Sequence, residues 1–340
     1  MMTIMGRNNA SLTIISVNAD HQKRAGQCQP AGRDKQVGAT CAVLLEIGPG
    51  EREIERAIDT LESVWAHEPR ISHVVVVDDE ISNRDLASRF APPRSCHLTI
   101  MSNPRCGRGD GSRAGTTAAV LAGLAAIQRK MDVDIVAKID TDSLIIAPFA
   151  ERVVEVFRAH PTAGIIGHHS NQHTETVNHQ REVRRLRQYA TLRRQPYWHV
   201  SLALWGRHAR MRRQIKQAFR HGYFLGEHCQ GGGYAVSREA LDRMARAGAL
   251  RDPLQWLDAR TGEDVVVGIG VRSVGLAQHD ASGPGGPFGV QWQGLPAMPE
   301  DLLRQGKAII HSIKTDPRIG EDEIRAFFHA RRPRREQETS

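Results

Sequence analysis

The stretch Asp134-Ile-Val-Ala-Lys-Ile-Asp-Thr-Asp142 decides the fold of this 340-residue chain. Its run of mainly apolar residues predicts a strand that is buried on both faces, as in the parallel sheet of an α/β protein. A second run, His73-Val-Val-Val-Val-Asp-Asp79, has the same character and also ends on acidic residues. Because ligand-binding groups gather at the carboxyl ends of such strands, these acids are candidate site residues.

Around these two runs, apolar segments of strand length alternate with helical patterns. We expect further strands at 41–47, 98–101 and 164–167, and helices at 51–67, 113–130 and 149–159. In the first of these helices, Ile54, Ile58, Leu61 and Trp65 recur at helical spacing. This alternation predicts an α/β fold with a mostly parallel, doubly wound central sheet flanked by helices.

The net charge of +8 is concentrated in two segments. Twelve basic residues and one acid lie between Arg181 and Arg220, and the last ten residues add four arginines against two acids. The rest of the chain has 30 basic residues against 35 acids. The body of the protein is therefore slightly acidic, and we expect a basic helical insertion at about 175–225.

The ends of the chain differ in composition from its middle. Residues 1–38 are polar and aperiodic apart from Leu12–Val17, which predicts a disordered arm. A single domain is expected at 39–320, followed at 321–340 by a C-terminal helix and a basic disordered tail.

Cysteine usage and hydropathy indicate the compartment. The five cysteines include no C-x-x-C pair, so neither a disulfide framework nor a zinc ribbon is indicated. The N-terminus lacks a signal-peptide pattern, and no run approaches the roughly 18 apolar residues of a membrane span. We expect a cytoplasmic protein, with peripheral contact at the inner membrane surface as an open alternative.

Two acidic pairs carry the clearest chemistry. Asp140 and Asp142 can share one divalent cation at the end of a buried strand, although turn acids that cap the next element are the plainer alternative. Glu263 and Asp264 begin a helix, where acids often only complement the helix dipole. Their functional interpretation is a general base, a carboxylate that takes a proton from a hydroxyl.

Glycines and a histidine supply weaker signals. Gly231-Gly232-Gly233 permits close backbone approach to a ligand, or forms a hinge. Arg108, in a turn between Gly107 and Gly111, either contacts an anion or belongs to an ordinary loop. His311 follows the apolar pair Ile309-Ile310 and is either a ligand or a plain surface histidine.

Taken in order, these segments resemble a known family. A buried strand ending in D-x-D, then G-G-G-Y-A-V-S at 231–237, then G-E-D-V-V-V-G at 262–268, then His311 is the order found in metal-dependent GT-A glycosyltransferases. The pattern is most similar to the inverting type that uses nucleoside-diphosphate sugars. The V-V-V-V-D-D strand resembles the family-2 start, and the later segments resemble the galactosyltransferase and fringe-like branch. The resemblance covers about residues 40–315.

The resemblance implies a role for each matching residue. Asp78 or Asp79 contacts the nucleobase, and the choice stays open because Glu80 replaces the usual glycine of family 2. Asp142 is a direct metal ligand, Asp140 lies nearer the ribose and a metal-bound water, and His311 completes the coordination of Mn²⁺ or Mg²⁺.

The acceptor side is implied in the same way. Asp264 is the catalytic base, Glu263 shapes the acceptor pocket, and Gly232 and Gly233 approach the donor sugar, with Arg108 as a further substrate contact. The donor is a nucleotide sugar, by expectation a UDP-sugar, and the acceptor is an unknown glycan or lipid-linked molecule. The nucleotide-binding half would span about 39–170 and the acceptor half about 226–320.

Two other classes of protein remain as alternatives. A nucleotidyltransferase of related fold would carry a basic glycine-rich loop after its first strand, whereas Gly48-Pro-Gly-Glu-Arg-Glu53 carries more acid than base. A nucleic-acid-binding protein would use the segment Arg181–Arg220, with strongly salt-dependent affinity. The same segment also suits a solvated helical pair, a seat for an anionic acceptor or an anionic membrane surface, with Trp198 and Trp205 as core, sugar-stacking or headgroup residues. Nucleic acid is the less favoured partner.

Overall fold

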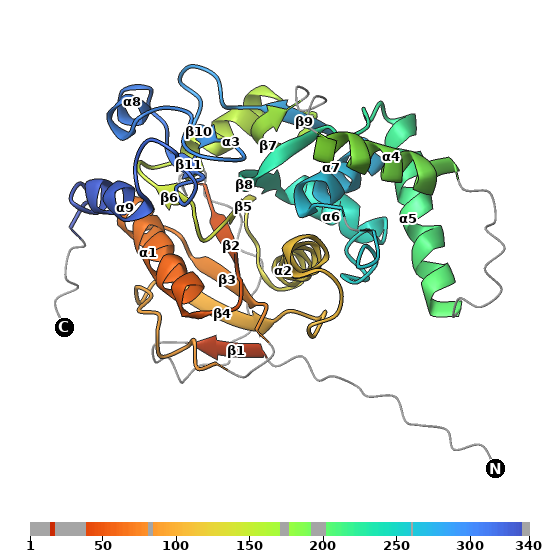
Figure 1. Ribbon diagram of the computed structural model, residues 1–340, viewed down its shortest axis with the longest axis horizontal. Helices are drawn as coiled ribbons and strands as arrows, with labels where there is room; N and C mark the ends of the chain where they lie inside the picture. Colours follow the sequence, from red (N-terminus) through yellow and green to blue (C-terminus); the bar gives the residue numbers. More distant parts are fainter. Residues whose placement is uncertain are drawn as a thin grey trace, which may run out of the picture.

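An eight-stranded sheet forms the centre of the computed structural model, which describes residues 14–17, 39–80, 84–170, 177–191, 202–259 and 261–334 (Figure 1). The strand order is β1-β4-β3-β2-β5-β8-β7-β9. The strands are β1 Ile14–Val17, β2 Cys41–Ile47, β3 His73–Asp78, β4 His97–Ser102, β5 Ile135–Ile139, β7 Ala163–Ser170, β8 His228–Ser237 and β9 Ala277–Asp280.

The directions of the strands place the functional segments at one edge. Strands β4, β3, β2 and β5 are parallel neighbours, whereas β8 runs antiparallel to both β5 and β7. Ile139 at the end of β5 pairs with Gly233, the sixth of the ten residues of β8, so His228–Gly232 extend past the end of β5. As a result, the beginning of β8 lies beside the carboxyl ends of β2 and β5.

Helices cover both faces of the sheet. They are α1 Glu51–His67, α2 Thr116–Lys130, α3 Ala150–Ala159, α4 Val177–Thr191, α5 Leu202–Arg220, α6 Arg238–Arg246, α7 Glu263–Ser273, α8 Pro299–Arg304 and α9 Glu321–His329. Helices α2, α6 and α7 cover one face, with α4 and α5 lying outside α7, and α1 and α3 cover the other (Figure 1). Val75 and Val77 of β3 pack into the first layer and Val74 and Val76 into the second. This two-sided burial explains why the strand lacks polar alternation.

A small second sheet connects the D-x-D turn to the C-terminal part of the chain. Its order is β10-β11-β6, with β6 Leu144–Ile145, β10 Phe288–Val290 and β11 Ile309–His311. Leu144 of β6 and Ile310 of β11 share an apolar cluster with Ile324 and Phe328 of α9. Because β6 begins two residues after Asp142, its pairing with β11 brings His311 back to the aspartates.

The structure confirms the predicted α/β fold with a mostly parallel central sheet, and it corrects two local expectations. The interpretation of residues 1–38 as a disordered arm is wrong for Ile14–Val17, which pair antiparallel with β4 as β1. This tetrapeptide, in which three of four residues are β-branched, covers an edge strand whose backbone groups would otherwise lack partners. The other residues of that arm, and residues 335–340 of the expected tail, lie outside the described residues. Arg332 still bonds Asp59 at 2.6 Å, so ordered contacts continue past α9.

The basic segment forms α4 and α5 where it is described. Leu186, Met211 and Ile215 are buried in the core, so the apolar residues among the arginines hold both helices against the protein. Exposed basic side chains include Arg184 and Arg213. Trp198 and the side chain of Trp205 lie outside the described residues. Among the helices that the structure describes, none has the length and hydropathy to cross a membrane.

Candidate functional site

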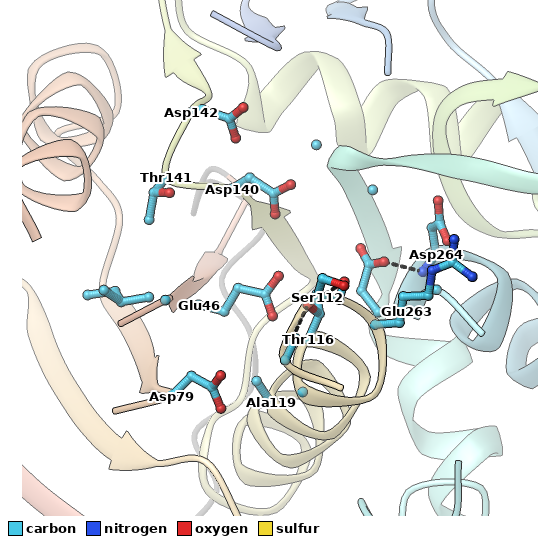
Figure 2. A pocket seen from close by; sticks show the side chains of 18 of the residues that line it. Glu46, Asp79, Ser112, Thr116, Ala119, Asp140, Thr141, Asp142, Glu263 and Asp264 are labelled. Atoms are coloured by element: carbon cyan, nitrogen blue, oxygen red, sulfur yellow. Dashed lines mark hydrogen bonds between the residues drawn. The ribbon is translucent and has the colours of Figure 1, made fainter. Parts of the chain in front are cut away.

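A cleft of about 760 Å³ opens at the carboxyl ends of β2 and β5, a size typical of small-molecule sites. Figure 2 shows Asp140 and Asp142 at one side of it and Glu263 and Asp264 at another, with Glu46 and Asp79 below. The start of α7 and the turn before α2 complete the wall. The acids predicted from three separate segments therefore share one cleft.

Asp140, Asp142 and His311 form a cluster that can hold a divalent metal ion. One ligand atom from each lies within 4.8 Å of the others. The Nε2 atom of His311 is 3.3 Å from Oδ1 of Asp142 and 3.7 Å from Oδ2 of Asp140. Two carboxylates and one imidazole can bind either Mn²⁺ or Mg²⁺, so the donor set does not select between the two ions.

Contacts behind the cluster orient its ligands. The Nδ1–H of His311 donates to the carbonyl of Gln291 at 2.8 Å, which leaves Nε2 facing the two aspartates. The hydroxyl of Ser312 donates to Oδ2 of Asp142 at 2.6 Å, and Nζ of Lys314 lies 3.3 Å from the same oxygen. Supporting hydrogen bonds of this kind are typical of metal ligands, so the residues present fit a bound cation.

Electrostatics in the cluster also favour a cation. Burial alone would raise the pKa of Asp142, but the charges of His311 and Lys314 and the Ser312 hydrogen bond lower it far below its ordinary value. Burial opposes the charged form of His311, yet Asp142 and Asp140 raise its pKa. Asp142 is therefore ionised at neutral pH, and a metal ion would replace the proton on His311.

The triple glycine has two different environments. A Cβ atom built on Gly232 would lie 2.0 Å from Cγ of His311, so the imidazole occupies the space that any side chain would need. A Cβ on Gly233 would instead meet Ile309 at 2.9 Å, beneath the small sheet. Gly232 lines the cleft, whereas Gly233 is not among its lining residues.

Lys138 is the centre of a buried charge cluster that the sequence interpretation missed. Its Nζ atom bonds Asp140, lies 2.9 Å from Glu263 Oε1 and 2.8 Å from the Gly231 carbonyl, and is 3.6 Å from Glu46. These carboxylates raise the pKa of Lys138 against the effect of its burial. Desolvation in turn raises the pKa of Glu46 to about 8 and that of Glu263 to about 7, although Lys138 counteracts it. The sequence contained one signal of this charge cluster, because Lys138 lies inside a strand that was predicted to be buried.

Asp264 lies in the first turn of α7, beside the cleft. Its Oδ1 atom accepts a hydrogen bond from the amide of Val265 at 2.7 Å, and its Oδ2 atom is 3.6 Å from Nε2 of His228. Acidic side chains in the first turn of a helix complement the helix dipole, and Asp264 has that position. Glu263 is held by Lys138 on the other side of the same turn, so the two neighbouring acids have different surroundings.

The structure separates the two acids that end β3. Asp79 lines the cleft and accepts two hydrogen bonds of 2.6 Å from Arg105 and one of 2.7 Å from Asn103. Asp78 bonds Arg84 and the amide of Glu80, and it is not among the lining residues. Of the two candidates, Asp79 is thus the one that faces the cleft.

Arg108 does not line the cleft, and Arg105 does. The guanidinium of Arg108 donates to the carbonyls of Arg105 at 2.8 Å and Pro104 at 3.2 Å. It therefore closes its own turn, and the arginine that lines the cleft is Arg105, three residues earlier. Other lining residues without a motif include His228 at the start of β8 and the exposed Trp292 at the rim.

Comparison with known proteins gives no family. No protein-family model matches this chain, and no curated protein matches its sequence. The fold and the site geometry are therefore the basis for its function.

Proposed function

We propose that this protein is a divalent-metal-dependent glycosyltransferase that moves a hexose from a nucleoside-diphosphate sugar, by preference a UDP-sugar, to an acceptor hydroxyl with inversion. One observation carries the proposal: the Asp140–Asp142–His311 cluster and the carboxylate of Asp264 open into one cleft. The order of motifs that resembles the GT-A family supports the same interpretation.

The proposed donor site uses the sheet end of the cleft. A bound Mn²⁺ or Mg²⁺ would neutralise the diphosphate and stabilise the negative charge on the leaving group. Asp140, Asp142 and His311 would hold that ion, while Asp79, fixed by Arg105 and Asn103, faces the region proposed for the nucleobase.

Asp264 is the proposed catalytic base. It lies at the start of α7 and lines the cleft, with a side chain 20% accessible. It would remove the proton of the acceptor hydroxyl as that oxygen attacks the sugar, which is a single displacement. Glu263, neutralised in part by Lys138, would shape the floor of the acceptor pocket.

The acceptor class follows less directly and is part of the proposal. The exposed basic side chains of α4 and α5 would favour an anionic acceptor, either a charged glycan or a lipid diphosphate at an anionic membrane surface. Sedimentation with anionic and neutral vesicles, at low and high salt, separates these two acceptors.

A thermal-shift panel of UDP-, GDP- and CDP-sugars with and without Mn²⁺ tests the donor proposal. We expect stabilisation by a UDP-sugar only when the metal is present, and its loss in Asp142→Asn. Asp264→Asn should keep that stabilisation and lose most UDP release, whereas the exposed control Asp322→Asn should change neither. The proposal fails when no nucleotide sugar gives metal-dependent stabilisation, or when Asp264→Asn retains near-normal turnover.

A further inference from the structure

The turn that follows α5 holds an aromatic side chain in solvent. Phe224 is 59% exposed, whereas its neighbour Tyr223 is 5% exposed. Single apolar residues are common on protein surfaces, so exposure alone assigns no partner. The backbone around Phe224 and the charges on α5 decide what this surface suits.

Helix α5 ends in a Schellman turn. Gly222 has a φ of 79°, a left-handed conformation that glycine adopts without strain. Its amide donates to the carbonyl of Phe219 at 3.1 Å, and the amide of Tyr223 donates to the carbonyl of Ala218 at 3.0 Å. The ring centroids of Tyr223 and Phe219 are 6.1 Å apart, so Tyr223 turns back onto the helix.

A second turn begins at Phe224 itself. The amide of Glu227 donates to the carbonyl of Phe224 at 2.9 Å. Gly226, in the third position, has a φ of 88°, the positive value that a type II turn requires there. Two consecutive turns therefore hold Phe224 at the end of α5, and a fixed backbone presents its side chain to solvent.

The outward face of α5 is basic. Three exposed residues recur on it at steps of three and four, and we call them the basic face: Arg213, Lys216 and Arg220. The opposite face of the helix is buried in the core through Met211 and Ile215. The basic face therefore runs along the outside of the protein and ends at the turn that holds Phe224.

No nearby acid offsets the basic face. The chain has no Asp or Glu between residues 183 and 226. Glu227, the next acid, is buried and lies 2.7 Å from Arg272. Asp252 lies 2.6 Å from Arg210, on a different side of α5. Among the residues that the structure describes, none forms an ion pair with the basic face.

The combination of charge and an inserted aromatic selects the partner. The phosphates of a nucleic acid would pair with the cations, but bases stack on aromatic residues that line a groove. Phe224 stands on a projecting turn and does not line the cleft. An anionic bilayer offers phosphate groups for the cations and, just below them, apolar chains for Phe224.

We propose that α5 and the turn after it dock this protein on an anionic lipid bilayer, with the basic face against the headgroups and Phe224 inserted below them. The docking surface lies outside α7, at the edge of the molecule on the right of Figure 1. Docking does not depend on sugar transfer. Under the proposed function, it places the protein beside a lipid-linked acceptor.

Vesicle sedimentation tests the docking in the absence of metal and nucleotide. We expect binding to vesicles of phosphatidylcholine mixed with phosphatidylglycerol, no binding to phosphatidylcholine alone, and release at high salt. Replacing the three residues of the basic face by Gln should weaken binding about fivefold for each charge, or about 100-fold together. Phe224→Ser should weaken it about tenfold, because less apolar surface enters the bilayer.

Two control variants separate the docking surface from general charge and apolarity. The triple variant Arg129→Gln, Lys130→Gln and Arg158→Gln removes the same net charge from exposed residues of α2 and α3. Met298→Ser removes an apolar side chain that is 37% exposed elsewhere. Both controls should bind the anionic vesicles as the wild type does. All the substituted side chains are exposed, and urea unfolding confirms that each variant is folded.

Insertion is measured with Phe224→Trp. Lipids brominated in their acyl chains should quench this variant's fluorescence more than that of the wild type, whose own tryptophans set the background. Absence of anionic vesicle binding, equal losses in the two triple variants, or no effect of Phe224→Ser overturns the docking. Binding of a labelled single-stranded RNA that is lost with the basic face, without vesicle binding, assigns the surface to nucleic acid instead. The nucleotide-sugar thermal shift is a separate assay, so failure of the docking and failure of the proposed function are distinguishable.

Discussion

Gly232→Ala tests the metal centre with a single methyl group. The added Cβ would lie 2.0 Å from Cγ and 2.1 Å from Nδ1 of His311. An ordinary contact needs about 3.5 Å, so the ring has to move by about 1.5 Å. That movement breaks the 2.8 Å hydrogen bond to Gln291 and displaces Nε2 from the aspartates, whereas metal–ligand distances tolerate about 0.2 Å.

The expected result is a selective loss of metal binding. Removing a supporting contact of a metal ligand costs about 10- to 100-fold in affinity, so displacing the ligand itself should cost about 100-fold or more. Overpacking should also destabilise the fold by about 1–3 kcal/mol. Electron paramagnetic resonance of free Mn²⁺ measures the affinity, and urea unfolding measures the stability. Gly283→Ala is the matched control, because its Cβ meets no atom within 4 Å.

A double-mutant cycle shows whether His311 is the cause. In a His311→Ala background the ring is absent, so Gly232→Ala should cost little stability there. An equal cost in both backgrounds, or wild-type Mn²⁺ affinity in Gly232→Ala, would refute the proposed contact between glycine and imidazole. The cycle also keeps the test decisive if Gly232→Ala alone folds poorly.

Three further predictions address the surroundings of the metal cluster. Lys138→Met leaves buried carboxylates without their counter-charge and should destabilise the protein by about 3–5 kcal/mol in urea unfolding; a loss below about 1 kcal/mol would contradict the cluster. Arg325→Gln removes the 3.0 Å hydrogen bond to the carbonyl of Thr141, which lies between the two aspartates, and should weaken Mn²⁺ binding about tenfold by calorimetry. The control is Arg331→Gln, because the guanidinium of Arg331 bonds the carbonyl of Phe327 and lies over its ring. Metal binding needs neutral His311, whose pKa is raised. Mn²⁺ affinity should therefore rise about tenfold per pH unit below that pKa and level off above it. An affinity that does not change between about pH 5.5 and about pH 8.5 would contradict the assignment of His311 as a metal ligand. In the metal-free protein the same raised pKa contributes stability below about pH 6.5, which is lost as pH rises through the folded pKa.

The strands were predicted best where a single physical cause, burial on both faces of the sheet, explains the pattern of apolar residues. Val74–Val77 could be assigned because burial on two faces leaves no room for polar alternation. The end of β5 predicted the position of Asp140 and Asp142, since the carboxyl ends of parallel strands meet at one edge. Ile14–Val17 was placed in a disordered arm because its partner strand, β4, follows some eighty residues later. No residue near Ile14–Val17 in the sequence indicates that pairing.

The partners within the site could not be predicted from spacing. Lys138 was passed over because its three carboxylate partners come from β2, the D-x-D turn and α7. The choice of Asp79 over Asp78 depends on which way each side chain leaves the strand end, and Arg105 and Arg84 decide it. Arg108 was chosen over Arg105 for the same reason: the turn's sequence does not show which guanidinium folds back on the backbone.

The charge of the cleft ties these observations together. Its lining includes seven acids, Glu46, Glu53, Asp79, Asp140, Asp142, Glu263 and Asp264, against Arg105, Arg113 and Lys314 among lysines and arginines. Even with Glu46 and Glu263 protonated, five carboxylates face these three cations and Lys138, which lies behind the lining and bonds Asp140. A nucleoside diphosphate adds further negative charge, so the cleft would repel it unless a cation enters as well. By linkage, each then increases the affinity of the other by the same factor. Helices α4 and α5 lie outside α7 and well away from β6, the strand that follows the aspartates, so their basic residues do not offset this repulsion (Figure 1). Under the proposed function, an anionic donor would therefore enter this acidic cleft together with a cation, whereas the net charge of +8 comes from the basic segment at 181–220 and the last ten residues.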